Sequence, residues 1–223
     1  DAWTVMFWVN VEYPIDGETD RRAYSESSQT TDDPLVNIGT HNAGEDNTVD
    51  LYIRNGGAQV NHFHSTSPGY DGTWRHVAAV FDHGSLSLYI DGALDPGTPL
   101  EYTRGTAPMD TTSIAAIVRG DGGNVAYYFT GSMDEVGAWE RALTAEEVRD
   151  VMDNGVSTPV PTYAPQVTGQ PVGNEDLVEG DSWTLNVRAS GTRPFKYQWR
   201  ENGENLSGET GATLELTNLS PSE

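Results

Sequence analysis

Two histidines, His62 and His64, are two residues apart in a segment, Ala58–His64, whose composition predicts a β-strand. Side chains at positions i and i+2 of a strand point to the same face, so the two imidazoles lie together. That spacing suits a metal ion, but two histidines without a third ligand favour a sugar-contacting or solvent-facing strand. Arg54 and Asn61 lie on the same pair of predicted strands and add polar groups that can hydrogen-bond a ligand.

Tyrosines near predicted loops supply a second kind of ligand contact. Carbohydrate-binding modules stack aromatic faces on sugar rings and place polar groups around them. The tyrosines in or near predicted loops are Tyr24, Tyr70, Tyr102, Tyr127 and Tyr128. Each of them can also simply pack at the edge of a core. The ligand-binding residues that we predict are Arg54, Asn61, His62, His64 and Tyr127.

Catalytic motifs are missing from the sequence. Retaining glycoside hydrolysis needs paired carboxylates across the sugar bond, and no strand carries a Glu-x-Asp pattern followed closely by a second Glu. The sequence also contains neither a Gly-x-Ser-x-Gly elbow nor a His-Glu-x-x-His zinc helix. We therefore predict no catalytic residues and no enzyme activity in this chain.

The composition limits the partners. The 223 residues carry a formal net charge of -22, which argues against nucleic acid and against anionic membrane surfaces. No apolar run is long enough for membrane insertion. The absence of cysteine in a chain rich in Gly and Pro favours a bacterial exported protein, extracellular or at the cell surface, that folds without disulfides.

Period-two alternation dominates the first two thirds of the chain and predicts an all-β fold. The predicted strands are Trp3–Val11, Leu35–Gly39, Val49–Arg54, Ala58–His64, Trp74–Phe81, Leu86–Ile90, Ile114–Val118 and Val125–Phe129. The polar, acidic stretch Glu12–Pro34 predicts a long loop, and Asp82–Ser85 predicts a tight turn. We assign Trp3, Trp74, Trp139, Trp183 and Trp199 to hydrophobic cores.

One helix is expected. Thr144 and Glu147 have the spacing of a capping box, in which each side chain satisfies a free backbone N–H of the other residue. Apolar residues repeat at helical spacing after this pair, and Asn154-Gly155 ends the helix.

Two motifs in this order carry a family resemblance. The segment Trp74–Gly92 (WRHVAAVFDHGSLSLYIDG) is followed by Phe129–Val136 (FTGSMDEV), then Trp139 and Arg141–Val148 (RALTAEEV). Together they resemble the laminin-G-like, concanavalin A-like jelly-roll family of secreted bacterial proteins. The resemblance implies a jelly-roll β-sandwich over residues 1–155 with one short C-terminal helix.

The resemblance also implies a structural calcium ion. In the family, the Asp of Gly-x-x-Asp-Glu-Val often helps to hold calcium, and Asp134 occupies that position here. Calcium takes six to eight hard oxygen ligands. The family's partner ligands commonly come from a Gly-Asp-rich segment before the first strand, which this sequence does not contain. Alternatively, Asp134 accepts backbone N–H groups at a strand turn.

A Pro-rich linker, residues 156–165, leads to a second block, residues 166–223. This block resembles the front part of a bacterial immunoglobulin-like domain, with Trp199 in the place of the buried core tryptophan and Val187 in the place of the first core cysteine. The sequence stops before the last two strands of that fold, so we expect a partial, marginally stable immunoglobulin-like β-sandwich.

We expect a non-catalytic carbohydrate-binding or adhesion module within a larger multidomain chain, with a glycan or another extracellular ligand as its partner. Two alternatives stay open because fold does not fix function. The chain can be an accessory part of a polysaccharide-degrading enzyme whose catalytic domain lies elsewhere, or a structural cell-surface stalk.

Overall fold

The computed structural model describes residues 2–11, 21–31, 35–40, 47–54, 60–102, 109–120, 122–157, 162–173, 177–192 and 195–219. The chain divides into two compact units, Asp1–Val160 and Pro161–Glu223. Residues 158–161 of the expected linker lie outside the described part. Strands are the main regular structure of the first unit, as the sequence predicts, and the second unit contains only short strands among its described residues.

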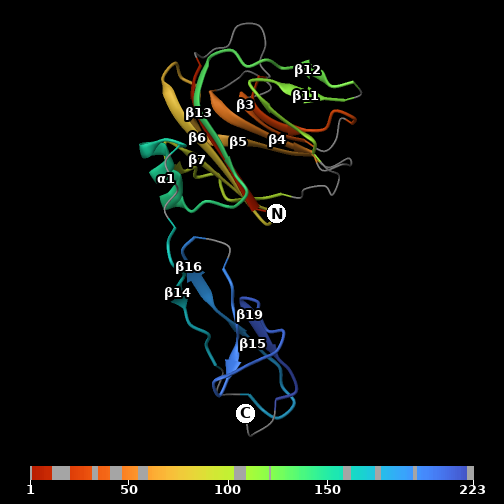
Figure 1. Ribbon diagram of the computed structural model, residues 1–223, viewed down its shortest axis with the longest axis vertical. Helices are drawn as coiled ribbons and strands as arrows, with labels where there is room; N and C mark the ends of the chain where they lie inside the picture. Colours follow the sequence, from red (N-terminus) through yellow and green to blue (C-terminus); the bar gives the residue numbers. More distant parts are fainter. Residues whose placement is uncertain are drawn as a thin grey trace. The chain divides into compact units, whose positions relative to one another are not determined.

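Two large antiparallel sheets form the sandwich of the first unit (Figure 1). The six-stranded sheet has the order β13-β1-β6-β7-β8, with β9 also paired to β7. Its strands are β1 (Ala2–Asn10), β6 (Trp74–Asp82), β7 (Ser85–Ile90), β8 (Ala93–Leu94), β9 (Leu100–Glu101) and β13 (Ser132–Trp139). The five-stranded sheet has the order β10-β2-β3-β4-β5. Its strands are β2 (Arg22–Ser27), β3 (Leu35–Thr40), β4 (Thr48–Arg54), β5 (Val60–Pro68) and β10 (Thr111–Ile114).

The hydrophobic core lies between these sheets. Alternate residues of each strand point inward and are almost completely buried, as strand geometry requires. The six-stranded sheet contributes Val5, Phe7, Val9, Val77, Ala79, Phe81, Leu86, Leu88 and Ile90, and the five-stranded sheet contributes Ala23, Val36, Ile38, Val49, Leu51 and Ile53. The indole of Trp3 stacks on Phe81 with ring centroids 3.9 Å apart, which closes one side of the core. The all-β sandwich expected from the sequence is confirmed.

The predicted hairpin and helix are confirmed. His83 and Gly84 turn the chain between β6 and β7 with φ of 50° and 94°, the left-handed values that such a short turn requires. Helix α1 (Ala145–Asn154) begins at Thr144 with both hydrogen bonds of the capping box. Its buried face packs on the outer side of the six-stranded sheet. No helix in the described residues is long and apolar enough to cross a membrane.

Several details differ from the sequence-based expectations. The strand predicted at Val125–Phe129 ends at Ala126, before Tyr127, whose φ is 54°. The stretch predicted as a long loop contains β2. This strand was not predicted because only its inward side is apolar, while its outward side carries polar residues. The strand predicted at Ile114–Val118 is broken at Ala115, where φ is 62°, so β10 and β11 (Ile117–Arg119) are separate. Trp74 is 46% exposed rather than a core residue, because it lies opposite Asn10 at the end of its strand pair, beyond the core.

The second unit consists of small antiparallel pairs. They are β14 (Gln166–Gly169) with β16 (Arg188–Ser190), β15 (Trp183–Asn186) with β19 (Thr213–Leu216), and β17 (Arg200–Glu201) with β18 (Glu204–Asn205). Among the described residues of this unit, Leu214 is the one hydrophobic side chain that is buried, at 6% exposure. Trp199 is half-buried and donates its indole N–H to the Gly211 carbonyl. An immunoglobulin-like domain here stays a proposal.

Candidate ligand-binding site

The site lies on the outer face of the five-stranded sheet. Along β4, Val49, Leu51 and Ile53 enter the core, so Asp50, Tyr52 and Arg54 must point the other way. The register then carries a row of polar residues across all five strands at one level. This row is Ser113, Ser25, Asn37, Tyr52 and His62.

A short hairpin buries part of this face. It consists of β11 and β12 (Asn124–Ala126) and contacts β2. The Tyr127 carbonyl accepts the Arg22 backbone N–H at 3.0 Å, and Ser27 donates its hydroxyl to the Val118 carbonyl. Polar side chains under this hairpin are therefore cut off from solvent. Among the described residues, the buried atoms Ser25 Oγ and Asn37 Oδ1 find no hydrogen-bond partner in the chain. Buried polar atoms of this kind often contact a ligand or water.

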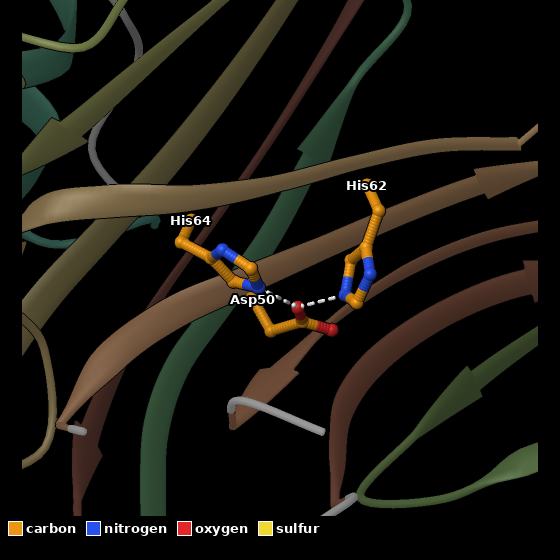
Figure 2. A group of neighbouring side chains, drawn as sticks. All are labelled: Asp50, His62 and His64. Atoms are coloured by element: carbon orange, nitrogen blue, oxygen red, sulfur yellow. Dashed lines mark hydrogen bonds and ion pairs between the residues drawn. The ribbon is translucent and has the colours of Figure 1, made fainter. Parts of the chain in front are cut away.

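Asp50 is the electrostatic centre of the face. Its side chain is completely buried, and its Oδ2 accepts a hydrogen bond from Arg22 Nη1 at 2.9 Å. Its Oδ1 lies 2.5 Å from His62 Nε2 and 3.2 Å from His64 Nε2 (Figure 2). A buried carboxylate is tolerated only with such partners. Burial and, to a smaller extent, the nearby Asp50 carboxylate raise the pKa of the Tyr70 hydroxyl well above its usual value.

Arginine and tyrosine side chains form a pocket beside Asp50. The cavity measures about 180 Å³ and is lined by Arg22, Asn37, Tyr52, Arg54, Ile117, Arg119 and Tyr127. The guanidinium groups of Arg22 and Arg119 lie 5.8 Å and 5.7 Å from the centroid of the Tyr127 ring. Arg22 also lies 6.0 Å from the centroid of the Tyr52 ring. These cation–π contacts hold positive charge on a small, partly enclosed surface.

The structure brings four of the five predicted ligand-binding residues to this face. Arg54 and Tyr127 line the pocket. His62 adjoins the pocket through a T-shaped contact with Tyr52, with the ring centroids 5.2 Å apart, and His64 lies beside His62. Asn61 alternates with these histidines along β5 and therefore points to the opposite face.

Sequence reasoning missed Arg22, Asn37, Asp50, Tyr52 and Arg119. For Asp50 and Tyr52 a signal was available, because both alternate with Val49, Leu51 and Ile53 and share the face of Arg54. Arg22 was hidden inside the stretch predicted as a loop.

Asp134 lies on β13 of the other sheet, where the pairing with β1 shifts register between Met6 and Trp8. Its exposed carboxylate accepts the backbone N–H of Glu135 at 2.8 Å, and Glu135 has a φ of 51°. Within the described residues, Asp134 belongs to no cluster of three or more potential metal-ligating side chains. A single exposed carboxylate is a poor match for the six to eight oxygens that calcium takes.

A larger cavity of about 620 Å³ lies at another part of the sandwich, beside Trp3, Tyr24 and Trp139. One face of the Trp3 ring is already stacked on Phe81, and the Tyr24 hydroxyl is bonded to Glu26. This cavity therefore offers fewer converging polar groups than the arginine–tyrosine pocket does.

Residues 1–149 match the family model of the concanavalin A-like lectin/glucanases superfamily. The chain belongs to this superfamily. The match covers the first unit, where the two motifs predicted a jelly roll of this kind.

Solved structures share the fold at low sequence identity. A SAP-like pentraxin from Limulus polyphemus, a native heptamer, is similar with a TM-score of 0.54 and 18% identity, over 71% of this chain and 74% of the other. The CBM40 module of a Ruminococcus gnavus IT-sialidase, bound to α2,3-sialyllactose, is similar with a TM-score of 0.53 and 18% identity, over 68% of this chain and 82% of the other. At this identity the likeness supports the fold and not a shared ligand.

Proposed function

We propose that the first unit is a carbohydrate-binding module whose ligand occupies the arginine–tyrosine pocket. The observation that carries this proposal is the convergence of Arg54, Arg119 and Tyr127 with the buried, unbonded Asn37 Oδ1 on one sheet face. Sugar sites combine aromatic faces with a few placed polar groups, and this pocket has both. The fold likeness to a sialyllactose-bound CBM40 supports the same function.

The ligand we propose carries an acidic group. Arg54 and Arg119 line this small cavity beside Arg22, whose charge Asp50 balances, in a chain whose net charge is -22, so these two arginines give the pocket a charge opposite to that of the protein as a whole. Arginine binds carboxylate and sulfate groups through paired hydrogen bonds. A volume of about 180 Å³ lies below the range of pockets for drug-sized ligands, so it suits one sugar unit or its acidic substituent.

The module acts by binding, and we propose no hydrolysis by this chain. It works in an extracellular or cell-surface setting, as one part of a larger multidomain protein. An accessory role beside a catalytic domain and a stalk role remain the alternatives. A reducing-end assay on neutral and acidic polysaccharides tests for hydrolysis, and turnover that persists after contaminating activity is removed would contradict a purely binding role.

Calorimetric titration with sialyllactose, a sulfated oligosaccharide, an oligouronate and neutral lactose tests the binding proposal. We expect at least one acidic glycan to bind more tightly than lactose. Arg54→Ala or Arg119→Ala should weaken that binding about 10- to 100-fold, because each removes a charge-assisted hydrogen bond worth about 1.5–3 kcal/mol. The control is Arg200→Ala, which removes an arginine hydrogen-bonded to Asn205 in the second unit.

The outcomes separate the two parts of the proposal. Binding of lactose as tight as that of the acidic glycans would reject the acidic group and keep the carbohydrate site. Binding that is unchanged in both pocket variants, or no binding of any glycan, would reject the site itself.

A further inference from the structure

Three potential metal ligands meet at the open end of the Asp50 cluster. Asp50, His62 and His64 each present one ligand atom, and these atoms all lie within 4.8 Å of one another. The ligand atoms of a tetrahedral zinc ion lie about 3.4 Å apart when the bonds are about 2.1 Å long. The three atoms that Figure 2 shows converging therefore lie near the separations that zinc ligands have.

Two paired strands hold these residues in place. His62 and His64 are two residues apart on β5 and share one face, and Asp50 lies directly opposite His64 on β4. The His62 ring makes a T-shaped contact with the Tyr52 ring, which restrains its orientation. A site built on paired strands keeps its geometry better than one built on a loop.

We propose that Asp50, His62 and His64 bind a first-row transition-metal dication, with Zn²⁺ as the best match. Imidazole nitrogen suits zinc, copper and nickel, and one carboxylate oxygen completes a three-ligand set that leaves a coordination position for water. Calcium takes six to eight oxygens, so this donor set discriminates against it. The site is therefore different from the calcium ion expected at Asp134, and it does not depend on glycan binding.

Arg22 positions the carboxylate without occupying the ligand atom. It contacts Asp50 Oδ2, while both histidines face Oδ1. Hydrogen bonds from outer residues commonly orient ligands in this way. The histidine side chains are 32% and 36% exposed, which gives an ion and its water ligands a path to Oδ1 although Asp50 itself is fully buried.

Calorimetric titration of the full, tag-free, chelator-treated chain with Zn²⁺ tests the proposal. We expect one equivalent to bind saturably, and Co²⁺ to give the visible absorption of a low-symmetry, low-coordinate site. His62→Asn and His64→Asn should each weaken Zn²⁺ binding by about tenfold or more, because each removes a direct ligand. His83→Asn is the matched control, because His83 also lies beside an aspartate, Asp82, at 2.7 Å but in an exposed turn.

Three results would overturn the proposal. One is the absence of saturable Zn²⁺ binding to the wild-type chain. Another is affinity in His62→Asn and His64→Asn equal to that of His83→Asn. The third is Ca²⁺ binding at this site as tight as that of Zn²⁺. Melting curves of the metal-free variants verify that they are folded. The Co²⁺ spectrum of the wild-type chain tests the site without any substitution, so it remains a valid test if a variant fails to fold.

Discussion

Replacing Asp50 by asparagine should destabilise the first unit more than any exposed charge change does. The substitution keeps the shape of the side chain but removes the negative charge beside Arg22, whose side chain is 5% exposed. Breaking a buried ion pair on one side leaves an uncompensated charge and costs about 3–5 kcal/mol. For a domain of this size each kcal/mol corresponds to about 2–4 °C, so the melting temperature should fall by about 6–20 °C.

The assay is differential scanning calorimetry of the full chain with a chelator present, which removes any contribution of bound metal. The matched control is Asp71→Asn, which breaks an Asp–Arg pair whose side chains are 26% and 29% exposed. Exposed pairs are worth about 0–1 kcal/mol, so this change should lower the melting temperature by about 4 °C at most.

A double variant tests the stated cause. If the buried charge of Arg22 causes the loss, Arg22→Met combined with Asp50→Asn should be more stable than Asp50→Asn alone, because no charge is then left in the interior. Equal, small effects of Asp50→Asn and Asp71→Asn would refute the reasoning. They would mean that water reaches Arg22 and that this sheet face is more open than the structure indicates.

Three further predictions concern other parts of the first unit. Burial lowers the pKa of the His76 imidazole to about 4, whereas in the unfolded chain the pKa of a histidine is near 6.5. As the pH falls, the unfolded chain therefore takes up the proton first, and the free energy of unfolding should fall by about 3 kcal/mol between pH 6.5 and pH 4. Denaturation of His76→Gln over the same pH range should show a correspondingly smaller loss. Thr144→Ala removes the helix cap and should cost about 1 kcal/mol in urea denaturation, while Thr112→Ala, at an exposed position, should cost less. If Asp134 holds calcium, the melting temperature should rise saturably with Ca²⁺ and Asp134→Ala should abolish the rise; a rise that sodium reproduces at equal ionic strength would reject the site.

Much of the fold could be predicted because the core-facing residues follow period two. Val5, Phe7 and Val9 lie on the core face of β1, and after the turn at His83-Gly84 the core residues Leu86 and Leu88 alternate with serines on β7. Strand β2 was not predicted because Arg22, Ser25 and Ser27, on the side of a strand that normally faces water, make the segment as polar as the loop around it. In the structure the β11–β12 hairpin covers that side. The sequence of a strand does not show which distant segment will cover it or pair with it.

The site was predicted only in part, for a similar physical reason. The spacing of His62 and His64 showed that they share a face, but their third partner comes from the neighbouring strand. The pairing of β4 with β5 fixes which residue of β4 lies opposite His64, and a shift of one residue would place Leu51 or Val49 there instead of Asp50. Asn61 was predicted on residue type, and strand alternation places it on the opposite face.

Arg22 belongs both to the Asp50 cluster and to the arginine–tyrosine pocket, and this double role limits what it can do. Its guanidinium neutralises a carboxylate that is fully buried, so it cannot turn to a ligand without leaving Asp50 without this cation. In the acidic-glycan site that we propose, the ligand is therefore bound mainly by Arg54 and Arg119, which are only half-buried. Substitution of these two arginines should change affinity with little loss of stability, whereas any change at Arg22 would alter both together. The position of Asp50 in the sheet thus makes Arg54 and Arg119, rather than Arg22, the arginines that we propose for ligand binding.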